Sequence, residues 1–291
     1  MSNALFTGCA SALITPFKNG QVDYAALDKL LEFQLNNGID AFVACGTTGE
    51  PSAMTDAEWE EVLSFVIRFV HGRVPVIAGS GGNCTADVIR KARRAKELGA
   101  DAQLCVTPYY NKTTQAGLIA HYTMIARDGA LPVILYNVPS RTGLNMLPDT
   151  LAVLSSEENI IGMKEASGDM IQIMEMIRLC EGRIAFYSGS DELTAPFRAV
   201  GGLGTISVLA NIAPAVMRDM CRLPLEQAAA LNLRYLSLIR ALFLEVNPIP
   251  VKAAAAMMGL CENEVRLPLV PLSPIHEQKL KNEMQKAGLI C

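Results

Sequence analysis

The chain has 291 residues, of which 51% are hydrophobic and 19% are charged, and its formal net charge is -4. This composition is typical of a globular protein with ample apolar material for a core, and it excludes a disordered chain. The slightly acidic balance, without any long run of like charges, argues against a nucleic-acid partner.

Two uncharged segments bear on membrane association and export. Residues 1–17 lack the positive start of a secretory signal. Residues 199–217 contain three glycines and Pro214, which favour a strand and a loop over a spanning helix. The 8 cysteines and 3 histidines are dispersed, without a CxxC pair or zinc-ligand spacing. We therefore expect no membrane segment, no metal site and a cytoplasmic location with reduced thiols.

Short apolar segments alternate with helical patterns along most of the chain. In the helical segments, apolar residues recur every three or four positions, as in 27–35, 59–70 and 88–95. Thr55 and Asp169 are predicted to cap helices. The near-continuous apolar character of the other segments indicates strands buried on both faces. The predicted strands are 9–14, 41–45, 74–79, 102–106, 133–136, 160–164, 184–188 and 204–208.

Eight such units predict an α/β fold, a (β/α)8 TIM barrel, over residues 1–223. Residues 224–291, helical in pattern and interrupted by prolines, are predicted to form a C-terminal helical extension packed on the barrel. The competing layout is an open, doubly wound sheet that binds a dinucleotide. The only glycine-rich candidate for that layout, residues 79–84, lacks the third glycine of the fingerprint.

In a barrel of this type the functional residues follow the carboxyl ends of the strands. Lys164 ends an apolar strand, where burial would favour a neutral amine able to form a Schiff base. The alternative is a buried lysine paired with a carboxylate, and the sequence leaves both open. Glu165 is adjacent, but alternation along the strand should point it away from Lys164.

Two other strand ends carry candidate residues. The Thr47–Thr48 turn offers hydroxyls and free N–H groups to a carboxylate, or is an ordinary polar turn. Arg141 could clamp a second carboxylate or form a surface salt bridge. Tyr136 could relay a proton or be a core tyrosine. The placement of these residues in consecutive units favours the functional readings.

Five segments together resemble the signatures of the dihydrodipicolinate synthase family, within the pyruvate-dependent aldolase superfamily. The resemblance spans nearly the whole chain in the right order. The segments are 46–50 (GTTGE), 107–111 (TPYYN), 136–143 (YNVPSRTG), 164–168 (KEASG) and 247–252 (NPIPVK).

The resemblance implies a reaction that condenses pyruvate with aspartate 4-semialdehyde to 4-hydroxy-tetrahydrodipicolinate, in lysine and diaminopimelate biosynthesis. Lys164 would form an imine with pyruvate, so that neither a further cofactor nor a metal is expected. Tyr136, Thr47 and Tyr110 would relay protons, with Tyr110 coming from a neighbouring subunit of a homotetramer of two tight dimers.

The resemblance also implies substrate contacts. The backbone of Thr47 and Thr48 would hold the pyruvate carboxylate, and Arg141 would bind the carboxylate of the aldehyde. Gly189 and Ile206 would line the rest of the pocket, largely through their backbone.

In members inhibited by lysine, an allosteric pocket at the tight-dimer interface often includes histidines after GTTGE. Here those positions hold Asp56 and Trp59, which leaves inhibition by lysine open. The candidate residues for such a pocket are Ser52, Asp56, Trp59, Asn83, Asp87 and Tyr109.

Three other functions are compatible with parts of the sequence. The nearest is another pyruvate-dependent lyase, acting on N-acetylneuraminate or a 2-keto-3-deoxy-sugar acid, and Arg141 argues against it because a sugar needs hydroxyl partners. A catalytically silent binding barrel is disfavoured by the joint presence of Lys164, Tyr136, Thr47 and Tyr110. A dinucleotide-dependent oxidoreductase lacks its fingerprint.

Overall fold

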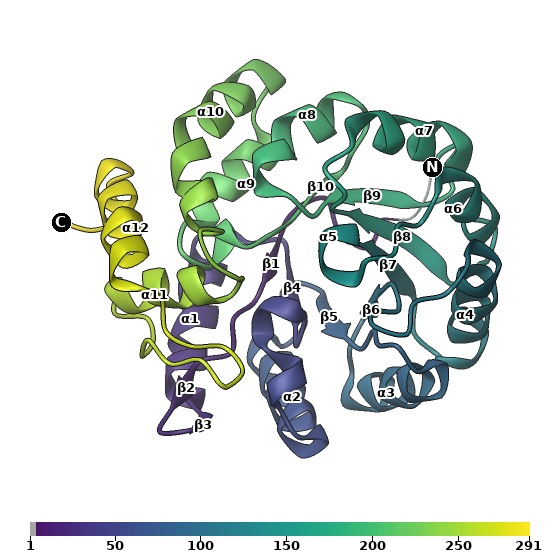
Figure 1. Ribbon diagram of the computed structural model, residues 1–291, viewed down its shortest axis with the longest axis horizontal. Helices are drawn as coiled ribbons and strands as arrows, with labels where there is room; N and C mark the ends of the chain where they lie inside the picture. Colours follow the sequence, from purple (N-terminus) through teal and green to yellow (C-terminus); the bar gives the residue numbers. More distant parts are fainter. Residues whose placement is uncertain (1–3) are drawn as a thin grey trace.

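The computed structural model describes residues 4–291 and contains a closed barrel of eight parallel strands (Figure 1). The strands follow the barrel in the order β1-β10-β9-β8-β7-β6-β5-β4, and β1 also pairs with β4 to close it. The predicted (β/α)8 barrel is confirmed, and every strand boundary lies within two residues of the predicted one. The barrel strands are β1 (Gly8–Ala12), β4 (Ala41–Ala44), β5 (Val76–Gly79), β6 (Ala102–Val106), β7 (Val133–Asn137), β8 (Ile160–Glu165), β9 (Ala185–Ser188) and β10 (Gly204–Ser207).

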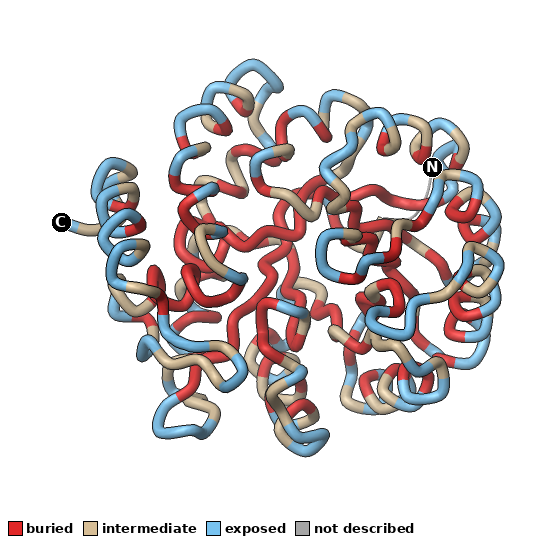
Figure 2. The backbone as a smooth tube through the Cα atoms, viewed as in Figure 1, coloured by how far each residue is buried: buried red, intermediate tan, exposed pale blue. Residues whose placement is uncertain are grey.

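Helices surround the strands and cover their outer faces, which is why the strands are buried on both sides (Figure 2). The two predicted caps are confirmed. Thr55 accepts from the N–H of Glu58 in a reciprocal capping box, and Asp169 accepts from two N–H groups of the next helix. The barrel helices are α1 (Tyr24–Asn36), α2 (Asp56–Val70), α3 (Thr85–Leu98), α4 (Gln115–Asp128), α5 (Pro139–Thr142), α6 (Pro148–Leu154), α7 (Met170–Cys180), α8 (Thr194–Ala199) and α9 (Pro214–Arg222).

A small antiparallel hairpin between β1 and α1 was not predicted. Its strands, β2 (Phe17–Lys18) and β3 (Gln21–Val22), are two residues each, too short to show an alternating pattern. Asn19 and Gly20 form the turn with φ angles of 53° and 78°, as in the two-residue turns that suit a hairpin.

Three helices follow the barrel: α10 (Leu225–Ala241), α11 (Ile249–Met257) and α12 (Pro274–Lys286). Figure 1 shows α11 and α12 together on one side of the barrel. Buried residues of these helices join the same apolar cluster as barrel residues, so the extension packs on the barrel. The proposed division at residue 223 falls between α9 and α10 and stays a prediction. Within residues 4–291, no helix combines the length and hydrophobicity needed to cross a membrane.

Candidate active site

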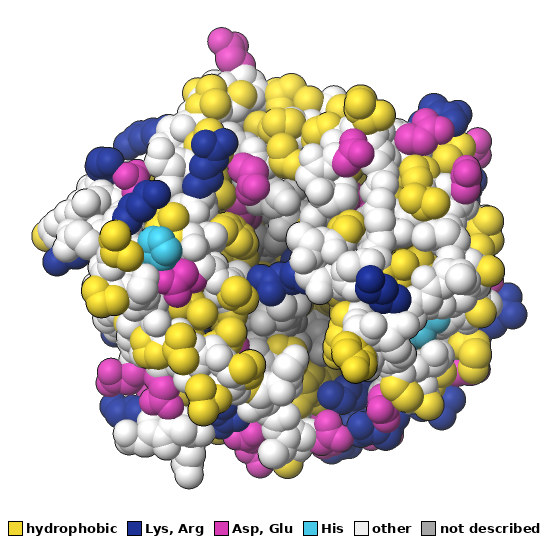
Figure 3. All heavy atoms as spheres, in the orientation of Figure 1, with side chains coloured by type: hydrophobic (Ala, Val, Ile, Leu, Met, Phe, Trp, Pro, Cys, Tyr) yellow, Lys and Arg dark blue, Asp and Glu magenta, His cyan; other side chains and the backbone are white. Residues whose placement is uncertain are grey.

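A cavity of about 790 Å³ opens at the carboxyl ends of the barrel strands. Figure 3 shows this face hollowed near its centre, with basic side chains at the edge of the hollow. Its lining combines strand ends of the barrel with the loop between α10 and α11. Six of the predicted site residues line it together: Thr47, Thr48, Tyr136, Arg141, Lys164 and Gly189.

Lys164 lies near the end of β8, directly beside Tyr136 on the neighbouring strand β7. Its Nζ atom is 4.4 Å from the centre of the Tyr136 ring, and only 6% of the residue is exposed. Burial lowers the pKa of Lys164 to about 8, because the ammonium is poorly solvated there. About a tenth of the amine is therefore neutral and nucleophilic at about pH 7, far more than for a lysine with its ordinary pKa.

No carboxylate of residues 4–291 forms an ion pair with Lys164, which answers the alternative left open by the sequence. Glu165 points elsewhere, as expected: its carboxylate accepts from the N–H of Ser167 at 2.6 Å and from the side chain of Asn137 at 2.9 Å. The lysine is thus buried with its charge uncompensated by a direct contact, an arrangement found more often at reactive sites than in structural cores.

Asp191 acts electrostatically on Lys164 and was not predicted as a site residue. It is 1% exposed, and its Oδ2 accepts from the N–H groups of Val208 and Leu209 at 3.1 and 2.8 Å. Burial raises the pKa of Asp191 to about 6 despite these bonds. Its charge favours the protonated form of Lys164 and so opposes part of the desolvation effect. The only sequence signal was its position just after β9.

Tyr136 lines the same cavity with its phenol side chain. Burial raises the pKa of Tyr136 to about 12, so the phenol stays protonated at neutral pH and can donate a proton or a hydrogen bond. The hydroxyl has no protein partner among the hydrogen bonds of the described residues. It is therefore free to interact with a molecule in the cavity.

Gly189 keeps room beside the lysine. A Cβ atom at this position would lie 3.1 Å from Cε of Lys164 and 2.6 Å from Cβ of Ala166. Its N–H donates to the carbonyl of Glu165 at 2.7 Å, which ties the end of β9 to β8. The prediction that Gly189 lines the pocket through its backbone agrees with this geometry.

The connection after β4 forms a short 3-10 turn over Thr47–Gly49, and its first residues lie at the cavity. The first N–H groups of such a turn have no partner within it, so they can receive an anion. The turn is also held by the segment that follows β1, where the Thr15 hydroxyl donates to the carbonyl of Gly49 at 2.8 Å.

Arg141 lies on α5 at the cavity and makes no ion pair with a carboxylate of residues 4–291, so it is not a surface salt bridge. Its guanidinium donates to the backbone carbonyl of Asn247 at 3.3 Å, which leaves most of its donors unused. A guanidinium held in this way can bind a carboxylate with two parallel hydrogen bonds.

Two predicted residues lie outside this cavity. Ile206 is 1% exposed on β10, and Val208, two residues further, lines the cavity in its place. β10 ends at Ser207, so Val208 is the first residue beyond the carboxyl end of the strand, at the level of the cavity. Tyr110 is 92% exposed, with a φ of 68°, and does not line the cavity of its own chain.

The loop from Phe243 to Asn247 also lines the cavity and was not predicted to do so. The NPIPVK segment was noted in the sequence, but nothing in it indicated a position opposite the barrel strands. Asn247 donates through Nδ2 to the Thr48 hydroxyl at 2.9 Å, which joins the extension to the turn after β4.

A second cavity, of about 290 Å³, adjoins the first and bears on the candidate lysine pocket. Ser52 and Tyr109 line it, whereas the other four candidates do not. Lys91 lines it as well, and its ammonium lies 3.5 Å from Asp56 and 5.6 Å from the Trp59 ring centre. The Asn83 side chain donates to the Tyr109 carbonyl, and Asp87 pairs with Arg90. An allosteric role for these six residues stays a prediction.

Comparisons with known proteins agree with this geometry. A family model described as the dihydrodipicolinate synthetase family matches residues 5–287. A 4-hydroxy-tetrahydrodipicolinate synthase of Lachnoclostridium phytofermentans is 50% identical over 99% of this chain and all of its own. That of Alkaliphilus oremlandii is 48% identical over 98% of this chain and all of its own.

The structural comparison gives the same answer. A solved dihydrodipicolinate synthase of Acinetobacter baumannii, described as chloride inhibited and complexed with pyruvate, superimposes with a TM-score of 0.96. It is 44% identical, and the match covers 98% of this chain and 99% of the other. The resemblance seen in the sequence motifs is confirmed, and the chain belongs to the dihydrodipicolinate synthetase family.

Proposed function

We propose that this protein is a lyase that condenses pyruvate with L-aspartate 4-semialdehyde to 4-hydroxy-tetrahydrodipicolinate, through an imine on Lys164, in lysine biosynthesis. The observation that carries the proposal is the buried amine of Lys164, which lies beside Tyr136 in the main cavity without a carboxylate partner. The names of the full-length relatives and the pyruvate complex of the Acinetobacter baumannii protein support the same substrates.

Pyruvate would bind with its carboxylate on the N–H groups of Thr47 and Thr48, next to Lys164 in the same cavity. The neutral amine attacks the keto carbon, and loss of water leaves the imine. The imine withdraws electrons, so a methyl proton is released and the methyl carbon becomes a nucleophilic enamine. No cofactor beyond the lysine amine is required for this step.

The enamine carbon then attacks the aldehyde carbon. As the new carbon–carbon bond forms, the aldehyde oxygen takes a proton. Tyr136 would pass this proton, because its phenol is protonated and lies against Lys164. The amino group of the second substrate next attacks the imine carbon. Ring closure breaks the bond to Nζ and returns Lys164 as a free amine.

Arg141 would bind the carboxylate of the aldehyde substrate. It lines the same cavity as Lys164 and has no carboxylate partner among residues 4–291. A sugar aldehyde offers hydroxyl groups at this position, which use a guanidinium poorly. Gly189 and the strand end that carries Ile206 complete the proposed pocket.

We also propose a homotetramer of two tight dimers in which Tyr110 enters the site of a neighbouring copy. Its 92% exposure and its absence from the cavity of its own chain support a role across an interface. Tyr110→Phe should then lower turnover sharply with an unchanged melting temperature, and unchanged turnover would exclude Tyr110 from the relay. The dispersed, unpaired cysteines are consistent with the proposed cytoplasmic location.

The test of the proposed function is consumption of aldehyde in the presence of pyruvate, comparing aspartate 4-semialdehyde with N-acetylmannosamine. Strong preference for the semialdehyde, reduced at least about a hundredfold in Arg141→Ala, is expected because the guanidinium proposed to bind the substrate carboxylate is lost. Turnover with the sugar alone would assign the chain to another lyase branch. The control Arg127→Ala removes an exposed arginine that pairs with Glu157 away from the cavity.

A further inference from the structure

The turn that would hold the pyruvate carboxylate has an unusual backbone at both ends. Cys45 and Glu50 flank the Thr47–Gly49 turn with φ angles of 55° and 57°, in the left-handed region. Residues other than glycine pay of order 1 kcal/mol or more for this conformation, which persists only where surrounding contacts hold it. The contacts that hold the Glu50 end come from the C-terminal extension.

Glu50 forms a fully buried ion pair with a lysine of the extension. Nζ of Lys252 on α11 lies 2.7 Å from Oε1 of Glu50, and the two side chains are 0% and 2% exposed. The backbone N–H of Arg266 donates to the other carboxylate oxygen at 3.0 Å. Both oxygens of Glu50 are therefore bound by residues more than 200 positions away, which fixes the carboxylate and with it the end of the turn.

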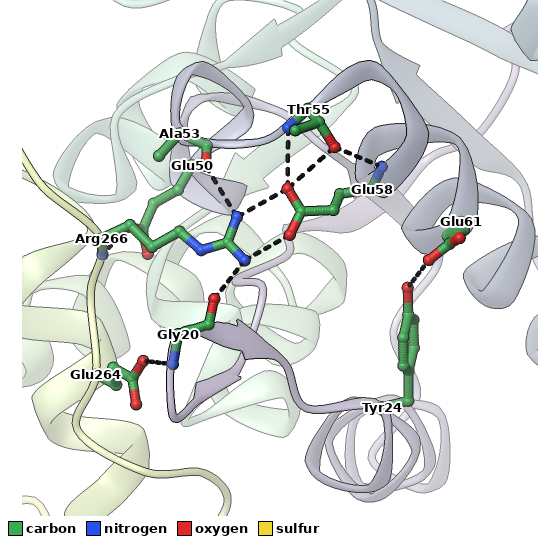
Figure 4. Close-up of polar contacts among 9 residues, drawn as sticks. All are labelled: Gly20, Tyr24, Glu50, Ala53, Thr55, Glu58, Glu61, Glu264 and Arg266. Carbon is green, nitrogen blue, oxygen red and sulfur yellow. Dashed lines mark hydrogen bonds and ion pairs between the residues drawn. The ribbon is translucent and has the colours of Figure 1, made fainter.

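The Arg266 side chain continues the same network to the start of α2 (Figure 4). Its guanidinium binds both oxygens of Glu58, at 2.6 and 3.0 Å, and the carbonyl of Ala53 at 2.9 Å. Glu58 also closes the capping box with Thr55. Figure 4 shows Arg266 reaching across from the extension, with the carbonyl of Gly20 as a further acceptor at 2.7 Å. The segment from residue 50 to residue 58 is thus anchored along its length.

Phe17 completes the anchor. Nζ of Lys252 lies 4.1 Å from the centre of its ring, and the Arg266 guanidinium carbon lies 4.3 Å from it. Both cations are therefore oriented by one buried aromatic ring as well as by their carboxylates.

None of Glu50, Lys252 and Arg266 is among the described residues that line either cavity at the strand ends. They cannot touch a substrate in those cavities, so any effect on catalysis passes through the turn. By contrast, Asn247 binds the Thr48 hydroxyl and lines the main cavity itself. This separation distinguishes a positioning residue from a binding one.

We propose that Glu50 and Lys252 are positioning residues through which the C-terminal extension sets the geometry of the carboxylate-binding turn. The proposal rests on the proposed function, because it assigns the turn to pyruvate. The C-terminal extension would then increase the affinity of the site for pyruvate, in addition to packing on the barrel.

The test compares two variants that keep the buried charge balanced. Glu50→Asp keeps the ion pair but shortens the side chain, so the turn must shift for the pair to form. Glu50→Gln with Lys252→Met removes both charges at similar volume, which avoids an unpaired buried charge. The control, Glu157→Gln, breaks the exposed pair with Arg127. For each protein we would measure melting temperature, kcat, both KM values and the pyruvate concentration that half-saturates the borohydride-trapped adduct.

Both test variants should raise the pyruvate KM and the half-saturating concentration in parallel, by about tenfold or more, because small displacements of binding groups have effects of this size. The semialdehyde KM and kcat at saturating pyruvate should stay within about twofold of wild type, since Arg141 and Lys164 are untouched. The control should match wild type in every measurement.

A folded variant of either kind with a wild-type pyruvate half-saturation would overturn the proposal. So would a fall in kcat with unchanged KM values, because that indicates only less folded enzyme. If the wild-type protein forms no adduct on Lys164, the proposed function fails and this inference fails with it. If wild type forms the adduct and the variants bind pyruvate equally well, only the positioning role is rejected.

Discussion

Two lysines among residues 4–291 are buried, and they differ in whether a carboxylate pairs with them. Lys164 and Lys252 each lie against an aromatic ring, with Nζ 4.4 and 4.1 Å from the ring centres of Tyr136 and Phe17. Burial lowers the pKa of both. Lys252, however, is paired with Glu50 at 2.7 Å, whereas Lys164 contacts no carboxylate of residues 4–291.

The difference shows how one residue type serves two purposes. A paired ammonium is stabilised in its charged form and holds two segments together, so Lys252 is suited to structure. An unpaired buried amine loses its proton more readily and has room to react, so Lys164 is suited to chemistry. The carboxylate partner, more than depth of burial, separates the two roles.

The largest expected effects come from removing each of the two amines in turn. Lys164→Ala should abolish turnover and the trapped pyruvate adduct, because no other lysine of residues 4–291 lines the main cavity. Lys252→Ala should retain the adduct at saturating pyruvate in whatever fraction of the protein folds. Turnover and mass spectrometry of the borohydride-reduced protein measure both, and an adduct that survives in Lys164→Ala would contradict the assignment.

The same pair predicts opposite effects on stability. Lys252→Met leaves the Glu50 carboxylate buried without a cation and should lower the free energy of unfolding by about 3–5 kcal/mol. Lys164→Met removes an unfavourably buried charge and should leave stability equal to or higher than wild type. Denaturant unfolding at neutral pH measures both. Destabilisation of similar size in the two variants would show that the lysines are equivalent in the core.

The pH dependence of adduct formation follows from the lowered pKa of Lys164. The neutral amine is the nucleophile, so the rate should rise about tenfold per unit well below pH 8 and level off above it. Aliquots quenched into borohydride from about pH 6 to about pH 10 give this profile. A midpoint near 10.5, the ordinary value for lysine, would mean that burial does not tune this amine.

Asp191→Asn gives the smallest predicted effect, a shift in the pH profile of adduct formation. The carboxylate favours the protonated form of Lys164, so its removal should lower the midpoint of the pH profile by about one unit or less. The asparagine oxygen can still accept from Val208 and Leu209, which preserves the fold locally. Glu277→Gln, at an exposed position on α12, is the matched control. An upward shift would be inconsistent with the electrostatic role.

The sequence predicted the barrel well because each strand is a short apolar segment bounded by polar residues, and eight of them recur in order. It also predicted Lys164, since a lysine that ends such a strand is unusual. It did not predict the Lys252–Glu50 pair, because 202 positions separate the partners and each residue alone resembles a surface charge. Pairing over that distance depends on where α11 packs.

Two smaller differences have the same origin. The family resemblance placed Ile206 in the pocket through its backbone, and this contact stays a prediction; the side chain that lines the cavity here belongs to Val208, just beyond β10. The loop from Phe243 to Asn247 was missed because it belongs to the extension, whose position over the barrel face is decided by tertiary packing. Tyr110 cannot be judged within one chain, since its proposed partner is another copy.

The most direct test of the difference between the two lysines is to map the site of the pyruvate adduct in the unaltered protein. The protein would be incubated with pyruvate, reduced with borohydride, digested and sequenced by mass spectrometry. We predict modification confined to the peptide that carries Lys164, with the Lys252 peptide unmodified. Modification of Lys252, or of any lysine other than Lys164, would contradict the claim that the unpaired buried amine is the reactive one.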